Sequence, residues 1–377
     1  MKVVTILGTR PEIIRISSVI ALLERHVNHV LVHTGQNYDY ELNEVFFEEL
    51  GVKKPDYFMN VDTSSLGHVY GGIMIKAEEI LAKEKPDAVL ILGDTNSSIA
   101  AIIAKRMKIP IYHMEAGNRC FDQNVPEETN RRIVDHTSDF NLCYTEHARR
   151  HLISEGLPHR RIYVTGSPMK EVLMAHMDKI KTSKILEELK LTKRKYFLAS
   201  IHREENVDNS ENLNKLIDAL EKIAKEYNYP IIVSTHPRTR KRLESLGRKK
   251  ISDKIRFLKP FGFLDYVKLQ MQACCVISDS GTICEESSML NFPAITVRNA
   301  IERPEAMDTG SIIVTGLDPD VIVDAIKMQT SQYIRQREVF VPDDYKIENT
   351  SERVVKLILG TAKLSNLWNG IKQRDLS

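Results

Sequence analysis

The chain has 377 residues, of which 42% are hydrophobic and 28% are charged, and its 53 Lys and Arg residues nearly balance its 51 Asp and Glu residues. This composition excludes a disordered, collagen-like or low-complexity protein, and the near-neutral charge argues against nucleic acid as a partner. Since no apolar run reaches the roughly 20 residues of a membrane span, we expect no membrane partner. The five cysteines lack metal-binding or disulfide-framework spacing, which indicates a cytoplasmic protein.

Short β-branched apolar runs alternate with stretches of helical periodicity along the chain. We predict strands at residues 3–9, 29–35, 88–94, 110–117, 140–145 and 161–167, and then at 195–202, 230–237, 255–260, 274–281, 293–299 and 311–316. Because these runs are apolar almost throughout, helices should cover both faces of each sheet, as in parallel α/β sheets. We therefore predict an α/β fold with Rossmann-like domains at 1–168 and 169–355, and a C-terminal helix at 356–377 that packs back on the first domain.

Polar residues follow the predicted strands of the first domain, and parallel sheets bind ligands at the carboxyl ends of their strands. Arg10 lies at the entry of a helix, where a helix N-terminus and a cation favour an anion; an ordinary surface Arg is the alternative. Asp94 and Glu115 each end a strand, with a helix cap and a structural ion pair as their respective alternatives. Glu127 lies in a first helical turn, where the helix dipole favours acids regardless of function.

The strand ends of the second domain carry a different set of residues. His202, Arg203 and His236 each follow a strand, and a structural histidine is the alternative for both His residues. Ser280 and Gly281 open a helix whose backbone donors suit a diphosphate, unless Ser280 only caps that helix. Further along, Glu286 suits ribose hydroxyls, and Arg303 adds positive charge.

Several familiar motifs are absent from the sequence. It contains neither GxGxxG nor GxxxxGK[ST] nor HExxH, and its scattered Asp and Glu residues form no metal-ligand cluster, so we predict no nicotinamide cofactor and no metal. The residues alone therefore predict two α/β domains holding one anionic, nucleotide-bearing ligand between them. They leave the reaction open.

Nine motifs in order carry a family resemblance over nearly the whole chain: GTRPEIIR (8–15), HTGQNYD (33–39), LGDTNS (92–97), HMEAGNR (113–119), VPEETNR (125–131), VTGSP (164–168), HREEN (202–206), SDSGTICEES (278–287) and ERPE (302–305). Together they resemble the non-hydrolysing UDP-N-acetylglucosamine 2-epimerase family. The resemblance implies a cofactor-independent isomerase acting on a UDP-amino sugar. It also implies a GT-B-like pair of Rossmann-like domains facing each other across a cleft, and a homodimer.

The resemblance also implies roles for individual residues. Asp94, Glu115 and Glu127 match the family's acid/base carboxylates, without a distinction between base and acid. The diphosphate and ribose ligands would be Arg10, His202, Ser280, Gly281, Glu286 and Arg303, and Arg203 and His236 complete this candidate set. Gln36 matches the motif for an allosteric ligand only in part, so we count it as a substrate-binding candidate.

Three departures from the family pattern suggest a branch. Arg15 stands where Lys is usual, Glu204 stands where Arg is usual, and the segment 118–128 is short. These changes resemble the branch that converts UDP-2-acetamido-2,6-dideoxy-β-L-talose to UDP-N-acetyl-L-fucosamine for capsules and O-antigens. The first alternative is conversion of UDP-N-acetylglucosamine to UDP-N-acetylmannosamine. A GT-B glycosyltransferase, a hydrolysing epimerase and a non-catalytic nucleotide-sugar sensor are the others.

Overall fold

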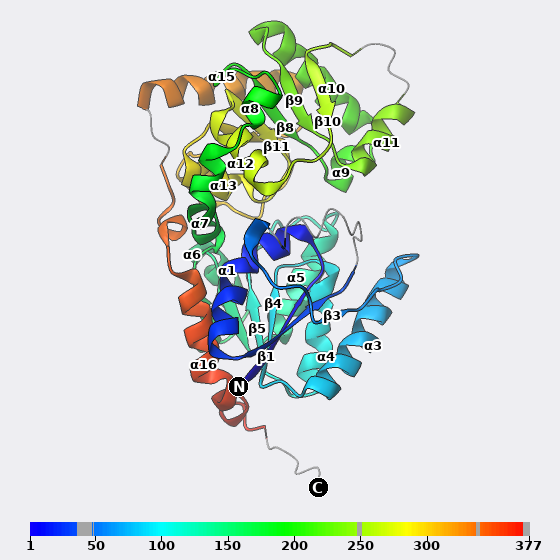
Figure 1. Ribbon diagram of the computed structural model, residues 1–377, viewed down its shortest axis with the longest axis vertical. Coiled ribbons are helices and arrows are strands. Elements are labelled where there is room, and N and C mark those ends of the chain that lie inside the picture. The colour runs from blue at the N-terminus through cyan, green and yellow to red at the C-terminus, as the bar shows by residue number, and fades with distance from the viewer. Residues whose placement is uncertain (36–46, 48, 247–250, 337–339, 372–377) are drawn as a thin grey trace. The chain divides into compact units, whose positions relative to one another are not determined.

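The computed structural model describes residues 1–35, 47, 49–246, 251–336 and 340–371, with the backbone alone for 332–336. The chain divides into two compact units, which Figure 1 shows in ribbon form. Unit 1 comprises residues 1–175 and 344–377, and unit 2 comprises residues 176–343. Helix α7 (Met169–Thr182) and the short helix η3 (Asp343–Lys346) contain the two crossings between the units.

Unit 1 contains a seven-stranded sheet in the order β3-β2-β1-β4-β5-β6-β7, in which all pairings are parallel. The strands are β1 (Lys2–Leu7), β2 (Asn28–His33), β3 (Tyr57–Phe58), β4 (Ala88–Leu92), β5 (Ile111–Met114), β6 (Phe140–Cys143) and β7 (Ile162–Val164). Every residue of β4 and β5 is buried, as expected for central strands covered on both faces. The sequence reading missed β3, because two partly exposed residues give no apolar run.

The helices of unit 1 are α1 (Arg10–His26), α3 (Leu66–Glu84), η1 (Asn96–Ile99), α4 (Ala100–Arg106), α5 (Pro126–Thr137), α6 (Glu146–Ser154), η2 (His159–Arg161) and α16 (Thr350–Trp368). Pro11 lies in the first turn of α1, where its missing N–H costs no hydrogen bond. Although α16 ends the described chain, it packs beside α1 (Figure 1). The hydroxyl groups of Tyr112 on β5 and Thr361 on α16 are 2.6 Å apart.

Unit 2 contains a six-stranded parallel sheet in the order β10-β9-β8-β11-β12-β13. Its strands are β8 (Phe197–Ser200), β9 (Ile231–Ser234), β10 (Ile255–Leu258), β11 (Cys275–Ser278), β12 (Ala294–Thr296) and β13 (Ile313–Val314). Its helices are α8 (Ile185–Glu188), α9 (Glu204–Val207), α10 (Ser210–Tyr227), α11 (Pro237–Ser245), α12 (Phe263–Gln272), α13 (Ile283–Leu290), α14 (Glu305–Asp308) and α15 (Pro319–Gln336). The apolar faces of α10 and α15 pack on this sheet in one buried cluster.

The predicted fold class, two α/β units with parallel sheets flanked by helices, is confirmed. Each of the twelve predicted strands is present, and each ends before its predicted carboxyl end. β4, for example, ends at Leu92, so that Gly93 and Asp94 lie in the loop beyond it. Asp94, Glu115 and His202 therefore lie in loops that directly follow strands, where parallel sheets bind ligands.

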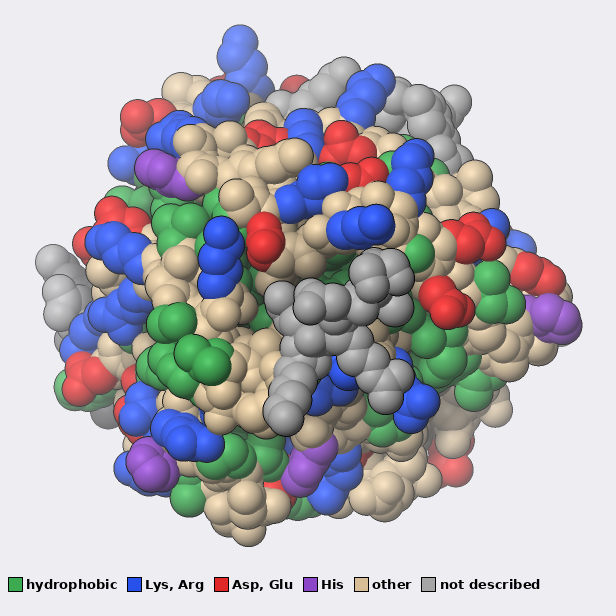
Figure 2. Space-filling model, turned by 90° about the horizontal axis from the view of Figure 1, so that it is seen from below, with side chains coloured by type: hydrophobic (Ala, Val, Ile, Leu, Met, Phe, Trp, Pro, Cys, Tyr) green, Lys and Arg blue, Asp and Glu red, His purple; other side chains and the backbone are tan. Residues whose placement is uncertain are grey.

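The surface agrees with the nearly balanced charge of the chain. On the face shown in Figure 2, Lys and Arg side chains are interspersed with Asp and Glu and with hydrophobic side chains. Within the described ranges, no helix combines the length and the apolar character that crossing a bilayer requires.

Candidate active site

Asp94 and Glu115 lie on neighbouring loops at the carboxyl edge of the unit 1 sheet. β4 and β5 are paired in parallel with Leu92 opposite Met114, so the two loops leave the sheet together. A Cβ atom added to Gly93 would lie 3.5 Å from Oε2 of Glu115, which shows how closely this carboxylate approaches the neighbouring loop. The sheet therefore brings together two of the three predicted acid/base carboxylates.

A guanidinium group holds each of these two carboxylates. The Arg131 Nε atom, on α5, is 2.7 Å from Oδ2 of Asp94, and Arg131 is only 3% exposed. Arg15, on α1, forms an ion pair with Glu115, which also accepts a 3.4 Å hydrogen bond from the amide of Asn118. The structural ion pair considered for Glu115 therefore exists, and it fixes the position of the carboxylate.

The backbone at Glu115 is strained. Its φ angle is +66°, a left-handed conformation that non-glycine residues rarely adopt. Eight other non-glycine residues in the described chain also have positive φ angles, among them the helix C-caps Lys85, Asn228 and Asn291. Glu115 differs from these three because it lies in a loop directly after a strand and its carboxylate forms an ion pair with Arg15.

The two acids at the start of α5 differ in burial. Glu127, the predicted residue, is half-buried in the first helical turn, whereas Glu128 is almost completely buried. Burial alone would raise the pKa of Glu128, but the hydrogen bonds from Cys120 and the charge of Arg131 outweigh it and lower that pKa. The Nη1 atom of Arg131 is 3.1 Å from Oε2 of Glu128, so Arg131 joins Glu128 to Asp94.

Glu12 is a buried carboxylate that the sequence reading did not select. It accepts hydrogen bonds from the Gly8 N–H (2.9 Å) and the Thr9 hydroxyl (2.8 Å) in its own turn. It also accepts hydrogen bonds from the hydroxyls of Thr95 (3.1 Å) and Ser97 (2.7 Å), which follow Asp94. Burial raises the pKa of Glu12, although these four donors oppose the shift. Glu12 thus ties the turn that carries Arg10 to the turn that carries Asp94.

The other two candidates of unit 1 are Arg10 and Gln36. Arg10 is the first residue of α1 and is half-buried, which agrees with its predicted place at a helix N-terminus. Gln36 lies outside the described residues.

At the edge of unit 2, Asp279 organises the loop that carries His202 and Arg203. Its carboxylate accepts hydrogen bonds from the backbone N–H groups of both residues, at 3.0–3.1 Å, and from the Asn206 amide at 3.1 Å. The Nδ1 atom of His202 is 3.1 Å from Oδ1 of Asp279, which leaves Nε2 as the ring atom available to a ligand. Burial raises the pKa of Asp279, but the charge of His202 and these hydrogen bonds outweigh it and hold that pKa at about 2.

Ser280 and Gly281 lie directly before α13, as predicted. The Ser280 hydroxyl accepts a 3.3 Å hydrogen bond from the Thr282 N–H and is 2.9 Å from the Thr282 hydroxyl. Thr282 is the N-cap residue of α13, but no side chain in the described structure caps the helix, so the alternative of a capping box with Ser280 or Thr282 as the cap is not observed. A Cβ atom at Gly281 would approach Oε1 of Glu302 to 2.7 Å, so any larger residue here would force the Glu302 side chain to shift. The loop brings backbone N–H groups to a helix N-terminus, where they suit an anion.

The remaining candidates of unit 2 have buried partners. Glu286 accepts a 2.6 Å hydrogen bond from the Gln270 amide, and Arg303 forms an ion pair with Glu285. The sequence reading left Arg298 out of the candidate set. Its Nη1 atom is 2.7 Å from Glu302, while its buried Nε and Nη2 atoms have no hydrogen-bond partner within the described structure.

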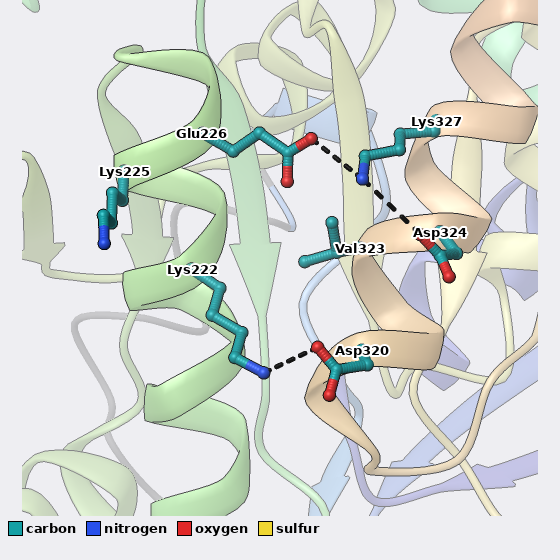
Figure 3. Close-up of a pocket in the computed structure, with 7 residues that line it drawn as sticks. All are labelled: Lys222, Lys225, Glu226, Asp320, Val323, Asp324 and Lys327. Atoms are coloured by element: carbon teal, nitrogen blue, oxygen red, sulfur yellow. Dashed lines mark hydrogen bonds and ion pairs between the residues drawn. The ribbon is translucent and has the colours of Figure 1, made fainter.

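His236 has the structural role that was the alternative to ligand binding. It is exposed and caps α11, accepting a hydrogen bond of 3.4 Å from the Arg238 N–H. A separate hollow lies between α10 and α15, and Figure 3 shows its ion pairs Lys222–Asp320 and Lys327–Glu226. None of the candidate residues lines it. No group of three or more His, Cys, Asp or Glu residues fit for a metal ion occurs in the part of the chain that the structure describes.

The sheet edge of unit 1 carries two carboxylates paired with arginines, and the sheet edge of unit 2 carries a helix N-terminus, a histidine and arginines. This combination on two Rossmann-like units is that of an enzyme acting on nucleotide-linked substrates. The chain belongs to the UDP-N-acetylglucosamine 2-epimerase family, which matches residues 21–359. This finding confirms the family resemblance and the prediction of a nucleotide-sugar isomerase.

Two relatives indicate the range of named activities in the family. A UDP-N-acetylglucosamine 2-epimerase of Methanococcus maripaludis is 40% identical over 86% of this chain and 91% of its own length. A UDP-2,3-diacetamido-2,3-dideoxy-D-glucuronate 2-epimerase of Pseudomonas aeruginosa is 33% identical over 89% of this chain and 94% of its own length. Their names share the UDP-linked acetamido sugar and the reacting carbon C2.

Two solved structures match the fold. A UDP-N-acetylglucosamine 2-epimerase from Rickettsia bellii has a TM-score of 0.93 and 50% identity and covers 99% of this chain and 100% of its own. The enzyme from Methanocaldococcus jannaschii, in complex with UDP-GlcNAc and UDP, has a TM-score of 0.89 and 34% identity, with coverages of 96% and 100%. The GT-B-like fold class is thereby confirmed.

Proposed function

We propose that this protein inverts C2 of a UDP-2-acetamido sugar by eliminating UDP and adding it back. The observation that carries the proposal is the pair of carboxylates Asp94 and Glu115 on adjacent loops, each held by its own arginine. Epimerisation needs one group to remove the C2 proton and another to return a proton to the opposite face. Two fixed carboxylates at one sheet edge suit this exchange.

The elimination step proceeds as follows in this proposal. A carboxylate takes the C2 proton, the C2–H electrons form a C1–C2 double bond, and the bond between C1 and the β-phosphate oxygen breaks. The products are UDP and a 2-acetamidoglycal. In the reverse step the phosphate oxygen attacks C1 while an acid protonates C2 on the other face. Asp94, Glu115 and Glu127 are the proposed proton-transfer groups.

Unit 2 would hold UDP during the reaction. His202, oriented by Asp279, and the N–H groups before α13 are suited to the charge of the departing diphosphate. Glu286 would accept the ribose hydroxyls, and Arg203 and Arg298 would add positive charge. The complex of the Methanocaldococcus jannaschii relative with UDP-GlcNAc and UDP supports a UDP site in this family.

The finer proposal concerns the sugar. Arg15, Glu204 and the short segment 118–128 favour UDP-2-acetamido-2,6-dideoxy-β-L-talose, with UDP-N-acetyl-L-fucosamine as product. The names of the relatives support UDP-N-acetylglucosamine equally well. Of the three departures, Arg15 contacts a proposed reacting carboxylate, whereas Glu204 is 64% exposed and pairs with Arg238. The choice of sugar therefore rests mainly on Arg15 and the short segment.

Proton NMR in deuterated buffer tests the proposal. Each of the two UDP-sugars is offered separately, with no nicotinamide and no metal added. Deuterium at C2 of the talose compound alone, with a fucosamine product, supports the reaction and the branch. Exchange in the glucosamine compound alone supports the reaction with the other sugar, and no exchange in either compound contradicts the proposed function and favours a glycosyltransferase. The homodimer and the cytoplasmic location stay predictions.

A further inference from the structure

One buried histidine joins the two loops that carry Asp94 and Glu115. His113 lies on β5 and is 1% exposed. Its Nε2 atom is 2.8 Å from the carbonyl oxygen of Gly93, directly before Asp94. Its Nδ1 atom is 2.9 Å from Oδ1 of Asp135, a fully buried residue of α5. The imidazole ring therefore connects the loop of Asp94 to Asp135.

Asp135 holds the loop that follows Glu115. Its carboxylate accepts the Gly117 N–H, at 3.2 Å to Oδ2, and the Arg119 guanidinium, at 2.7 Å. Gly117 has a φ angle of +85°, and a Cβ atom there would lie 2.3 Å from the carbonyl oxygen of Ala148. The loop is thus clamped at Gly117 on one side by Asp135 and on the other by packing against α6. Both contacts help to enforce the strained backbone at Glu115.

The hydrogen bonds indicate the protonation of the ring. A carbonyl oxygen can only accept, and an ionised carboxylate can only accept, so both ring nitrogens of His113 face acceptors and both must donate. The charged groups packed around the ring agree with this assignment. Asp135 faces His113 and Arg119, and Arg119 also pairs with Glu155 at 2.7 Å. Glu155 is also shared with His136 at 3.0 Å and with Arg132 at 4.0 Å, so an imidazolium at His113 joins a network of acidic and basic groups in which Asp135 is its direct counter-ion.

We propose that His113, as an imidazolium, is the positioning residue that keeps the loops of Asp94 and Glu115 at a fixed separation, with Asp135 as its partner. His113 contacts no substrate in this proposal. It acts through the Gly93 carbonyl and through Asp135, so that the two carboxylates remain aligned with the opposite faces of C2. Misplacement of a reacting group by about 1 Å can lower a rate about 10²-fold, which sets the size of the expected effect.

The first experiment measures the protonation of both ring nitrogens of His113 by ¹⁵N NMR of histidine-labelled protein near neutral pH. The His113 signals are assigned by their loss in His113→Gln. A proton on both nitrogens supports the proposal. A ring with one unprotonated nitrogen would overturn it, because Asp135 or a water molecule would then have to supply the missing donor. This measurement does not depend on turnover.

The second experiment compares kinetics of His113→Gln, Asp135→Asn and the double variant. We expect each single variant to lose about 10²-fold in kcat and the double variant to lose no more than about tenfold further, because the two residues act as one unit. UDP affinity measured by calorimetry should change less than about threefold, since all the proposed UDP ligands except Arg10 lie in unit 2. Losses of about 10⁴-fold in the double variant, or wild-type kcat in His113→Gln, would overturn the proposal.

A matched control is His29→Gln. His29 is also buried in the unit 1 sheet, with Nε2 2.8 Å from the Thr5 hydroxyl, but it lies near the opposite end of its strand. The control reports the cost of replacing a buried histidine, and its kcat should equal the wild-type value. Equal losses of kcat in both variants would make the His113 effect one of general stability. The kinetic experiment rests on the proposed function, and absence of C2 exchange in the wild type would contradict that function. The NMR experiment is independent of turnover and still decides whether His113 is an imidazolium.

Discussion

The carboxyl edges of the two sheets carry ion pairs of opposite polarity. In unit 1 the Asp94 side chain is 25% exposed, while its partner Arg131 is 4% exposed. In unit 2 the His202 side chain is 46% exposed, while its partner Asp279 is fully buried. Arg203 and Glu302 repeat the second pattern, with side-chain exposures of 17% and 5%. In these three pairs the more exposed side chain is an acid in unit 1 and a cationic residue in unit 2, whereas Arg15 and Glu115 of unit 1 are equally buried, at 9% each.

This difference separates two chemical tasks. A buried partner fixes the orientation of the more exposed group without competing water. Accessible carboxylates suit proton transfer at carbon, and accessible cationic groups suit a diphosphate. We infer that unit 1 supplies the proton-transfer groups and unit 2 supplies most of the anion site, with Arg10 as the predicted contribution of unit 1 to that site. Each experiment below tests this division by changing one side of it.

The largest expected effect is on the unit 1 carboxylates. Glu115→Gln and Asp94→Asn keep the shape of each side chain but remove its ability to accept a proton as a carboxylate. We expect turnover to fall by about 10³-fold or more, within the range of general acid–base catalysis. UDP affinity by calorimetry should stay within about threefold of wild type, because UDP binding is assigned mainly to unit 2.

The control for these variants is Glu79→Gln, on an exposed position of α3 beside Lys76. Its turnover should match that of the wild type. Full activity in Glu115→Gln or Asp94→Asn would remove that residue from the mechanism. A large loss of UDP affinity would contradict the division of tasks between the units.

The next effect concerns His202. We expect His202→Ala to weaken UDP binding and to lower kcat together, because the same imidazole would contact the diphosphate before and during its departure. A hydrogen bond to a charged group contributes about 1.5–3 kcal/mol, which corresponds to roughly 10- to 150-fold in affinity. His159→Ala, at an exposed position in unit 1, is the control. Unchanged UDP affinity in His202→Ala would exclude the phosphate role.

The contrast between the edges also explains what could be predicted from the sequence. The strands were predictable because fully buried parallel strands are short apolar runs, and Asp94 and Glu115 were predictable because they directly follow such runs. Their loops begin earlier than predicted, because the predicted strands also included the glycine and polar residues that follow each apolar run, such as Gly93 and Asp94 after Leu92 and Glu115 after Met114. The two-residue strand β3 had no apolar signal of its own.

The buried partners were not predictable from composition or spacing. Arg131 lies 37 positions after Asp94, and Asp279 lies 77 positions after His202, so no local pattern joins the members of a pair. Glu12 sits in a first helical turn, where an acid is common for reasons of the helix dipole alone. A single sequence does not distinguish such a residue from one on the surface, because the distinction lies in tertiary packing.

A smaller effect is expected on the pH dependence of the free energy of unfolding, which tests the buried carboxylate Asp279 of unit 2. The pKa of Asp279 is about 2 in the folded protein, against an ordinary value of 3.8. A lowered folded pKa stabilises the native state above about pH 4, and this contribution disappears as the pH falls toward 2. The difference amounts to about 2 kcal/mol. Urea unfolding of Asp279→Asn should lack this part of the pH dependence.

Asp253→Asn, at an exposed position of unit 2, should keep the wild-type pH dependence and serves as the control. In unit 1 the buried partner of the pair is Arg131, which remains charged throughout this pH range. Titration of the buried partner is therefore expected to change stability in this range in unit 2 but not in unit 1. If Asp279→Asn retained the full acid sensitivity of the wild type, the carboxylate would not be the buried partner that orients His202.

The smallest effect is expected where neither member of an ion pair is buried. Lys222 and Asp320 are 2.7 Å apart between α10 and α15, but their side chains are 46% and 82% exposed (Figure 3). Water and salt screen such a pair, and ordering two long side chains offsets much of the attraction. Lys222→Ala should therefore leave both turnover and the urea midpoint indistinguishable from wild type. A loss of stability in Lys222→Ala as large as that in Asp279→Asn would show that burial does not determine how much an ion pair contributes. The division of tasks between the two units would then need another physical basis.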